Sequence, residues 1–239
     1  MNRVILSAST DETILAVTRQ HKLVDLEIEQ QINTEIVGCI YKGVVKNIVP
    51  AVDGIFVDIG IGKNAFLRRK DLLNEKRFPT EGSPILAQVI KSDTDMKGAL
   101  ITEKISMFGK YAVTLSGTGY IGVSKKIRQE SVRKRLKEIG KEICAEHMGL
   151  IIRTAAENAD MDEFRKDITR LKENWDIIQK RFRMEKSPTL LYRESDIIVK
   201  ALRDYVNKGT EILITDNRKI YERICKLNES EHTIEPDKI

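Results

Sequence analysis

The sequence has few of the residues on which enclosed metal sites depend, with three cysteines, three histidines and one tryptophan among 239 residues. Cys39, Cys144 and Cys225 are far apart and form no Cys-x-x-Cys pair, so they are predicted to be reduced packing residues. No run approaches the roughly 20 apolar residues of a membrane span, and the start lacks the apolar core of a signal peptide. The sequence therefore predicts a cytoplasmic protein with no membrane span.

Charge is plentiful and unevenly distributed. The chain is 41% hydrophobic and 32% charged, a globular composition, and its formal net charge is +5. Between Lys104 and Lys141 there are ten Lys or Arg residues and only two acidic ones. Local basic surface attracts polyphosphate, although a solvated helix face rich in lysine explains the same composition. Charge alone leaves both interpretations open.

Three short alternating segments open the chain, at residues 4–6, 13–18 and 24–28. They predict an antiparallel meander with one solvated face. In the third segment Val24, Leu26 and Ile28 alternate with acidic residues, which are therefore expected on the solvated face.

From Cys39 the sequence changes to five short β-runs punctuated by glycine, which predict a small barrel of the OB type. Residues 110–115 and 120–124 flank a Ser-Gly-Thr-Gly turn and predict a β-hairpin. Further elements are predicted by periodicity, namely helices at 131–143, 161–183 and 196–205 and strands at 149–154, 190–192 and 211–215. Trp175 belongs to the apolar stripe of the second helix, and packing is a better explanation for it than base stacking.

Residues 216–239 contain one helical-turn pattern, formed by Ile220, Ile224 and Leu227, and then a polar, acidic run. A further strand would be expected to pair with residues 211–215, and nothing after Leu227 offers one. We interpret this segment as the end of a shortened chain.

Three segments together resemble the RNA-binding S1 domain: Tyr41-Lys42-Gly43, followed by Gly54 to Gly60, and then Asn64 to Leu67. The resemblance implies that Phe56 and Phe66 lie on an exposed barrel face, where bases stack on them. The alternative is that both rings fill the barrel interior. Alternation favours the first interpretation, because it places the apolar trio of Ile55, Val57 and Ile59 on the face opposite Phe56.

The order of motifs that follows resembles the ribonuclease E/G family: MKGALITEKISMFGKYAVTL, GVSKKI, MGLIIRTAAENAD, ESDIIVKALRDY and EILITDN. The resemblance implies an α+β fold, with an OB-type S1 β-barrel inserted in an α/β framework made of an RNase H-like part and a five-prime sensor. The expected divisions are a first RNase H-like piece at 1–34, the S1 barrel at 35–105, a sensor-like domain at 106–210 and a second RNase H-like piece at 211–239.

The resemblance also implies a pocket for the five-prime monophosphate of an RNA, at Gly109, Val113, Arg153 and Thr154. A guanidinium can bind two phosphate oxygens at once, a hydroxyl adds a donor, and glycine lets backbone amides approach closely. Three lysines fall where the family has basic RNA contacts, at Lys97, Lys125 and Lys126. Without the surrounding motif, Arg153 would be interpreted as an ordinary surface charge.

Catalysis in this family resembles magnesium-assisted phosphodiester hydrolysis. The resemblance places the metal-binding carboxylates in a later domain, together with a zinc-binding cysteine pair and another arginine of the phosphate pocket. We therefore expect no catalytic residue, metal or cofactor in this chain, and no cleavage by it alone. The pairs Asp93/Asp95 and Asp160/Asp162 are predicted to be a loop and a helix cap, and residues 60–63 a barrel turn.

Three functions remain open. The chain is the RNA-binding portion of a ribonuclease E/G-type endoribonuclease, with single-stranded RNA as its partner and partial recognition of the five-prime monophosphate. Alternatively it is a stand-alone RNA-binding module that does not cut. The third interpretation is a shortened nuclease that completes its active site with a separate chain carrying the missing acidic residues.

Overall fold

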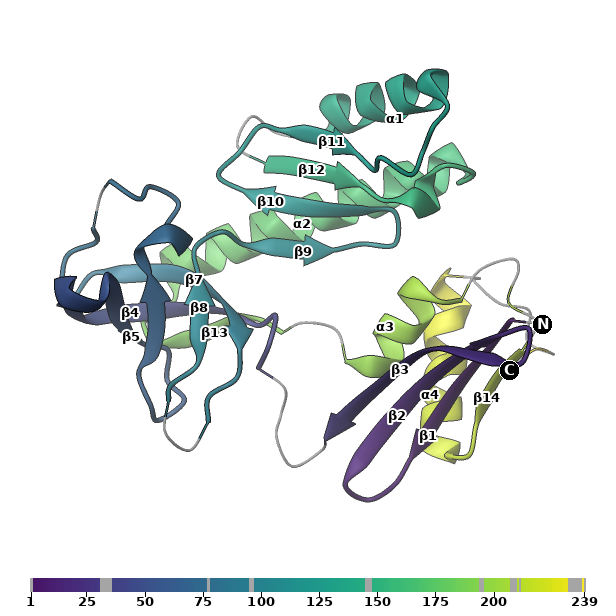
Figure 1. Cartoon of the computed structure of the whole chain (residues 1–239), viewed down its shortest axis with the longest axis horizontal. Helices are drawn as coiled ribbons and strands as arrows, with labels where there is room; N and C mark the ends of the chain where they lie inside the picture. The colour runs from purple at the N-terminus through teal and green to yellow at the C-terminus, as the bar shows by residue number, and fades with distance from the viewer. Residues whose placement is uncertain are drawn as a thin grey trace. The chain divides into compact units, whose positions relative to one another are not determined.

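The computed structural model confirms an α+β fold, and its strands and helices group into two compact units (Figure 1). Unit 1 combines residues 1–35 with residues 195–239, and unit 2 comprises residues 36–194. The structure describes residues 2–30, 36–76, 78–94, 97–144, 148–193, 196–206, 210, 212–231 and 238. Asp95 and Glu211 therefore lie outside the described residues.

Unit 1 is a four-stranded sheet in the order β14-β1-β2-β3. Its strands are β1 (Asn2–Ala8), β2 (Glu12–Arg19), β3 (Lys22–Gln30) and β14 (Ile212–Thr215). The predicted antiparallel meander is confirmed for the first three strands, whereas β14 pairs with β1 in parallel. Arg3 lies opposite Ile212, so residues from both ends of the chain complete one sheet.

One face of this sheet forms the core of unit 1. Val4, Leu6 and Leu15 are buried in a cluster with residues of two helices, α3 (Ile197–Asp204) and α4 (Arg218–Glu231). The helix α4 has 14 residues, so the single helical turn expected near Ile220 was too short an estimate.

The predicted orientation of β3 is wrong. Val24, Leu26 and Ile28 are each more than half exposed, while the acidic side chains of the same strand face α3. Asp25 accepts a hydrogen bond from the Tyr205 hydroxyl, and the Glu27 carboxylate lies 2.6 Å from Lys200 Nζ. These polar partners on α3 determine which face of β3 is covered.

The barrel belongs to unit 2 and is closed by pairing between its first and last long strands, β4 and β7. Its strands are β4 (Ile40–Val49), β5 (Gly54–Asp58), β6 (Ala65–Arg68), β7 (Pro84–Lys91) and β8 (Leu100–Thr102). Short 3-10 helices follow β4 at Pro50–Val52 and β6 at Arg69–Asp71. The strand β13 (Thr189–Tyr192) adds to the outer side of β4.

The barrel interior is filled as alternation predicted. Ile55, Val57 and Ile59 are at most 1% exposed and pack with Ala65 and Leu67 in one cluster. The neighbouring residues 60–63 form the expected turn, in which Gly60 and Gly62 have φ values of +83° and +93°. Such values are accessible to glycine at little cost.

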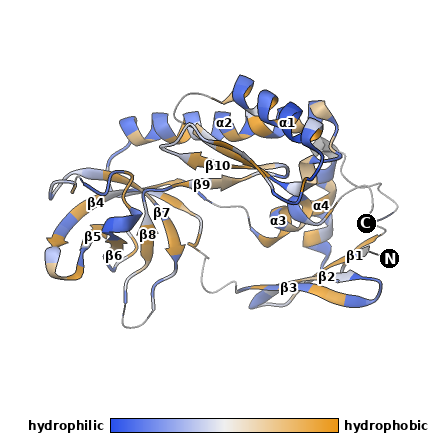
Figure 2. Cartoon of the chain, turned by 45° about the horizontal axis from the view of Figure 1, so that its top comes forward, coloured by the Kyte–Doolittle hydropathy of each residue, from blue (hydrophilic) through white to orange (hydrophobic). Residues whose placement is uncertain are grey.

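The remainder of unit 2 is a second four-stranded sheet in the order β11-β12-β10-β9, covered on one face by two helices (Figure 1). Its strands are β9 (Ser106–Phe108), β10 (Ala112–Ser116), β11 (Ile121–Val123) and β12 (Met148–Ile152). The helices are α1 (Glu130–Ile143) and α2 (Met161–Met184), with a 3-10 turn at Thr154–Ala156 between β12 and α2. Figure 2 shows α2 hydrophilic over much of its length, as expected for a helix with one buried stripe.

The predicted hairpin of residues 110–115 with 120–124 is wrong. The two strands β10 and β11 do not pair with each other, because β12 lies between them, antiparallel to β10 and parallel to β11. The apolar run of β12 is the physical reason, since a largely buried central strand has its backbone groups satisfied by neighbours on both edges. The actual hairpin joins β9 and β10.

The helix predictions in this part are confirmed, including the cap of α2. Asp160 is the N-cap residue, and its carboxylate accepts a hydrogen bond of 2.8 Å from the amide of Asp162. Phe164, Ile168 and Leu171 of α2 are buried, and Trp175 packs partly buried against the same cluster. Among the described residues, no helix is long and apolar enough to cross a membrane.

Candidate nucleic-acid interface

Phe56 and Phe66 are the centre of the outer barrel face. They lie directly opposite each other on β5 and β6, and their ring centroids are 5.4 Å apart with an interplanar angle of 54°. Both side chains are half-buried, whereas the residues on either side of them are fully buried. The pair therefore presents two adjoining aromatic surfaces at the edge of solvent, as base stacking requires.

Gly54 makes room for this arrangement. A Cβ atom at position 54 would lie 2.2 Å from Cζ of Phe66, which shows that the ring covers the glycine backbone. Any larger residue would displace the ring. Gly54 is thus a positioning residue for Phe66.

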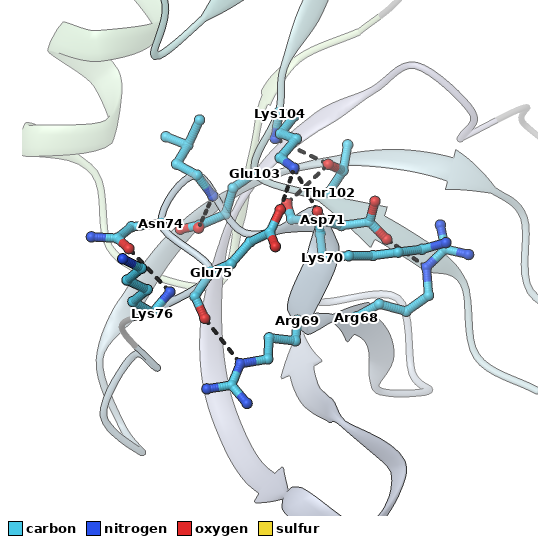
Figure 3. A network of polar contacts seen from close by, with 11 residues as sticks. Arg68, Arg69, Lys70, Asp71, Asn74, Glu75, Lys76, Thr102, Glu103 and Lys104 are labelled. Carbon is cyan, nitrogen blue, oxygen red and sulfur yellow. Dashed lines mark hydrogen bonds and ion pairs between the residues drawn. The ribbon is translucent and has the colours of Figure 1, made fainter.

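Arg68 is a cation that the sequence analysis did not single out. It is two residues after Phe66 on β6, so alternation places both side chains on the same face. Figure 3 shows its guanidinium directed at Asp71, with Nε 2.5 Å from the carboxylate oxygen Oδ2. The side chain is 37% exposed, which leaves its outer edge accessible to a phosphate.

The segment after β6 is tied down by a polar network (Figure 3). Lys104 Nζ donates to the carbonyl oxygen of Lys70 at 2.5 Å and lies 3.1 Å from the Glu75 carboxylate. The Arg69 Nε donates 2.9 Å to the carbonyl oxygen of Glu75, and its guanidinium stacks over the Phe78 ring. These hydrogen bonds and ion pairs therefore hold Arg68, Arg69 and Lys70 in place beside Phe66.

Burial perturbs one carboxyl group in this network. Glu103 accepts a 2.9 Å hydrogen bond from the amide of Leu73. Removal from solvent raises the pKa of Glu103 above its ordinary value, and the hydrogen bond opposes this shift only in part. The raised pKa reflects a structural role, because Glu103 connects the end of β8 with the segment after β6.

A second group of candidate residues meets at one end of the four-stranded sheet β11-β12-β10-β9 in unit 2. The Arg153 amide donates to the carbonyl oxygen of Tyr111 at 2.8 Å, and its Nη1 donates to that of Gly109 at 2.8 Å. Val113 lies opposite Ile151, two residues before Arg153. The structure therefore brings Gly109 and Val113 together with Arg153, which is about 40 residues later in sequence.

The loop at Gly109 is held by Asp167, a 6% exposed carboxylate on α2. Asp167 accepts hydrogen bonds from the amides of Lys110 and Tyr111, at 3.2 and 2.8 Å. A Cβ at Gly109 would lie 2.5 Å from Asp167 Oδ2, and the Gly109 amide donates to Ala112 within the turn. The glycine thus permits close packing on Asp167, and the expected approach of these amides to a phosphate is replaced by that contact.

Tyr111 closes the same loop from the other side. Its hydroxyl donates a 2.5 Å hydrogen bond to Glu163 on α2. Burial and this hydrogen bond raise the pKa of Tyr111 above its ordinary value, so the phenol stays protonated at physiological pH.

Thr154 lies beside a hydroxyl that the sequence analysis missed. Its Oγ1 is 3.1 Å from Ser124 Oγ, at the end of β11. The Ser124 carbonyl accepts a 2.7 Å hydrogen bond from Arg133 of α1. This contact fixes the turn that carries Lys125 and Lys126, both of which are exposed. Only the parallel pairing of β11 with β12 brings Ser124 to Thr154.

Lys97 lies apart from these lysines, in the barrel loop that precedes β8. Its amide donates to Thr94, whose own amide donates back to the Lys97 carbonyl. In the described residues, no group of three or more His, Cys, Asp or Glu side chains could hold a metal ion.

Comparison with family models assigns most of the chain. Residues 34–102 match the S1 RNA binding domain, and residues 106–239 match the ribonuclease E/G family. The chain belongs to the ribonuclease E/G family. The S1 resemblance of the barrel is confirmed by the same comparison.

Curated members of the ribonuclease E/G family align over nearly the whole chain. Ribonuclease G of Escherichia coli (strain K12) is 32% identical over 240 residues, which are 93% of this chain and 49% of that protein. Ribonuclease G of Haemophilus influenzae is 31% identical, with 92% and 48% covered. Ribonuclease E of Buchnera aphidicola subsp. Schizaphis graminum is 31% identical, with 93% and 25% covered. The chain spans about half the length of the ribonucleases G that it matches.

Proposed function

We propose that this chain binds single-stranded RNA across the barrel face that carries Phe56 and Phe66, as the RNA-binding portion of a ribonuclease E/G-type endoribonuclease in RNA processing and decay. The 5.4 Å ring pair on the outer face of an S1 domain carries this proposal. Stacking contributes about 1–3 kcal/mol per base and tolerates any sequence. Arg68 adds a cation beside the rings, and Lys97 is proposed to contact the RNA backbone.

The second part of the proposal is recognition of a five-prime monophosphate at the end of the sheet. Arg153 and Thr154 supply the guanidinium and hydroxyl, next to Gly109 and Val113. The position of Ser124, 3.1 Å from the Thr154 hydroxyl, supports this site because two neighbouring hydroxyls can both donate to one phosphate. Lys125 and Lys126 add positive charge on the turn after Ser124.

Cleavage is proposed to need more than these 239 residues. The family's magnesium ion would polarise the phosphate and activate water, and the resemblance places its carboxylate ligands elsewhere. We expect that added magnesium leaves a bound RNA intact. Specific cuts in the presence of this chain alone would contradict this expectation.

Fluorescence anisotropy with single-stranded RNA tests both parts of the proposal. The double variant Phe56→Ala/Phe66→Ala should weaken binding of any RNA by at least about tenfold, because two stacking surfaces are lost. Arg153→Ala should weaken only the preference for a five-prime monophosphate over a five-prime hydroxyl. Arg183→Ala is the matched control, since it removes an exposed arginine from the end of α2.

The outcomes separate the two parts. Unchanged affinity in the phenylalanine variant, with an intact barrel by circular dichroism, would contradict the stacking assignment. Equal affinity of the wild-type chain for the two RNA ends would contradict the phosphate site and leave the stacking assignment standing.

A further inference from the structure

The uncovered face of the sheet β11-β12-β10-β9 carries a row of residues of which the proposed function uses only Val113. Gly122 lies opposite Ile151, Ile151 opposite Val113, and Val113 opposite Phe108, so the row crosses all four strands in register. Phe108 is 44% exposed and Ile151 is 40% exposed. With adjacent strands spaced by about 4.8 Å, the row is roughly 14 Å long.

An aromatic ring also stands at the other end of the row. A Cβ at Gly122 would lie 2.8 Å from Cε1 of Tyr120 and 3.3 Å from its Cζ and hydroxyl oxygen. The Tyr120 ring therefore lies over the Gly122 backbone, and it is 65% exposed. Two exposed rings, Tyr120 and Phe108, thus mark the two ends of a strip whose middle is aliphatic.

This face is distinct from the core of the sheet. The alternate residues of the same strands, such as Ile121, Leu150 and Ile152, are buried in one cluster with Leu136 of α1 and Phe164 of α2. Both helices consequently pack on the opposite face, and the Phe108–Tyr120 row is not needed to fill the interior.

We infer that the uncovered face of this sheet is a second stacking surface for the bases of single-stranded RNA, an inference that rests on the proposed function. A four-stranded sheet with helices on one face and exposed aromatic rings on the other can stack two or three bases. Alternation along β12 places Arg153 on the same side as Ile151. The turn with Lys125 and Lys126 follows β11 directly.

Charge selects RNA as the occupant. Five of the ten basic residues between Lys104 and Lys141 belong to α1, on the covered face of the sheet. The cations next to the strip are Arg153, on the same side as Ile151, and the exposed Lys125 and Lys126 beyond the end of β11. Cations beside flat, apolar rings complement a polymer of phosphates and bases. A protein partner with an apolar surface would gain little from this surplus of positive charge.

Anisotropy with RNAs of two lengths tests the inference on the full chain. An RNA of about 4 nucleotides can occupy one OB-type barrel, whereas one of about 16 nucleotides can reach further. We expect Phe108→Ala/Tyr120→Ala to weaken binding of the longer RNA by about tenfold and to leave the shorter RNA unaffected. The conservative variant Tyr120→Phe, which keeps the ring, should bind the longer RNA as the wild type does.

Tyr221→Ala is the matched control, because Tyr221 is 44% exposed and lies on α4 of unit 1. Loss of binding to the longer RNA in this control as well, or unchanged binding in Phe108→Ala/Tyr120→Ala, would overturn the inference. If that double variant instead abolished self-association of the chain at constant RNA affinity, the face would belong to a protein contact and the inference would also fail.

A different result would contradict the proposed function of the barrel. If Phe56→Ala/Phe66→Ala binds both RNAs like the wild type, the barrel assignment is wrong. If the loss appears only in Phe56→Ala/Phe66→Ala, the barrel binds RNA and the sheet does not.

Discussion

Asp167 shows how much of the phosphate-site geometry depends on one buried carboxylate. Its two oxygens hold the amides of Lys110 and Tyr111, and Gly109 packs against it. Arg153 in turn donates to the carbonyl oxygen of Gly109. The position of the arginine is therefore coupled to a residue that would not contact RNA.

Replacement of this carboxylate should destabilise the protein. Asp167→Ala leaves two largely buried amides without an acceptor, which we expect to cost about 2–4 kcal/mol of unfolding free energy. Asp167→Asn keeps one carbonyl acceptor and should cost less. Hydrogen–deuterium exchange of unit 2 would measure both, with the exposed Asp176→Ala on the same helix as control; equal protection in all variants would contradict the prediction.

Single residues of the barrel face were predictable from sequence to the extent that alternation determines them. Phe56 and Phe66 were predicted to point outward because the residues beside them make a better core. Arg68 was missed although the alternation that orients Phe66 also places Arg68 on the same face, two residues further along β6. Ser124 was missed because its importance comes from Thr154, 30 residues away, which only the fold brings close. No local pattern distinguishes Ser124 from an ordinary surface polar group.

Among the secondary-structure elements, β3 shows where the periodicity of a strand is ambiguous. One face of β3 is apolar and the other is acidic. Alternation shows which residues share a face, but it does not show which face packs against the rest of the protein. The deciding groups are Tyr205 and Lys200, which are 180 and 173 residues away from their partners in sequence. The helices α1 and α2 did not have this ambiguity, because each has only one apolar stripe.

Because of the orientation of β3, replacing two leucines of the meander should have different effects on stability. Leu15→Ala on β2 removes a 1% exposed side chain and should cost about 2–5 kcal/mol. Leu26→Ala on β3, at 52% exposure, should change stability by less than about 1 kcal/mol. Hydrogen–deuterium exchange of β1 and β2 would report both effects. A large loss of protection in Leu26→Ala would mean that the apolar face of β3 is covered.

The strand β11 illustrates a second limit at this scale. Turn residues at 116–119 favour a hairpin locally, but the backbone partner of β11 is a strand that follows about 25 residues later in the chain. Local turn chemistry cannot report a competitor at that distance. The barrel strands were better predicted, because each of them pairs with at least one strand that is next to it in sequence.

The distribution of charge over the whole molecule leads to a prediction about salt. For single strands the logarithm of affinity falls with the logarithm of salt concentration by about 0.7 for each neutralised phosphate. We expect RNA binding to weaken by about 10- to 100-fold between ~50 and ~200 mM salt. Lys125→Ala/Lys126→Ala should make this dependence shallower by about 1.4 in slope, because two phosphate contacts are lost.

The exposed lysines of α4 provide the control for this measurement. Lys219→Ala/Lys226→Ala removes the same charge from unit 1, and we expect it to leave the slope unchanged. If both double variants changed the salt dependence equally, the effect would come from the overall charge of the protein and not from local phosphate contacts.

The parallel pairing of β1 with β14 has a consequence for synthesis of the protein. Arg3 emerges from the ribosome about 200 residues before its partner Ile212, a delay of roughly 10–40 s at ordinary translation rates. During that interval the open side of β1 is an unpaired strand edge, a template for unwanted association. Unit 2, whose residues are contiguous, can mature first, and the earliest strands to be made are then among the last to find their place.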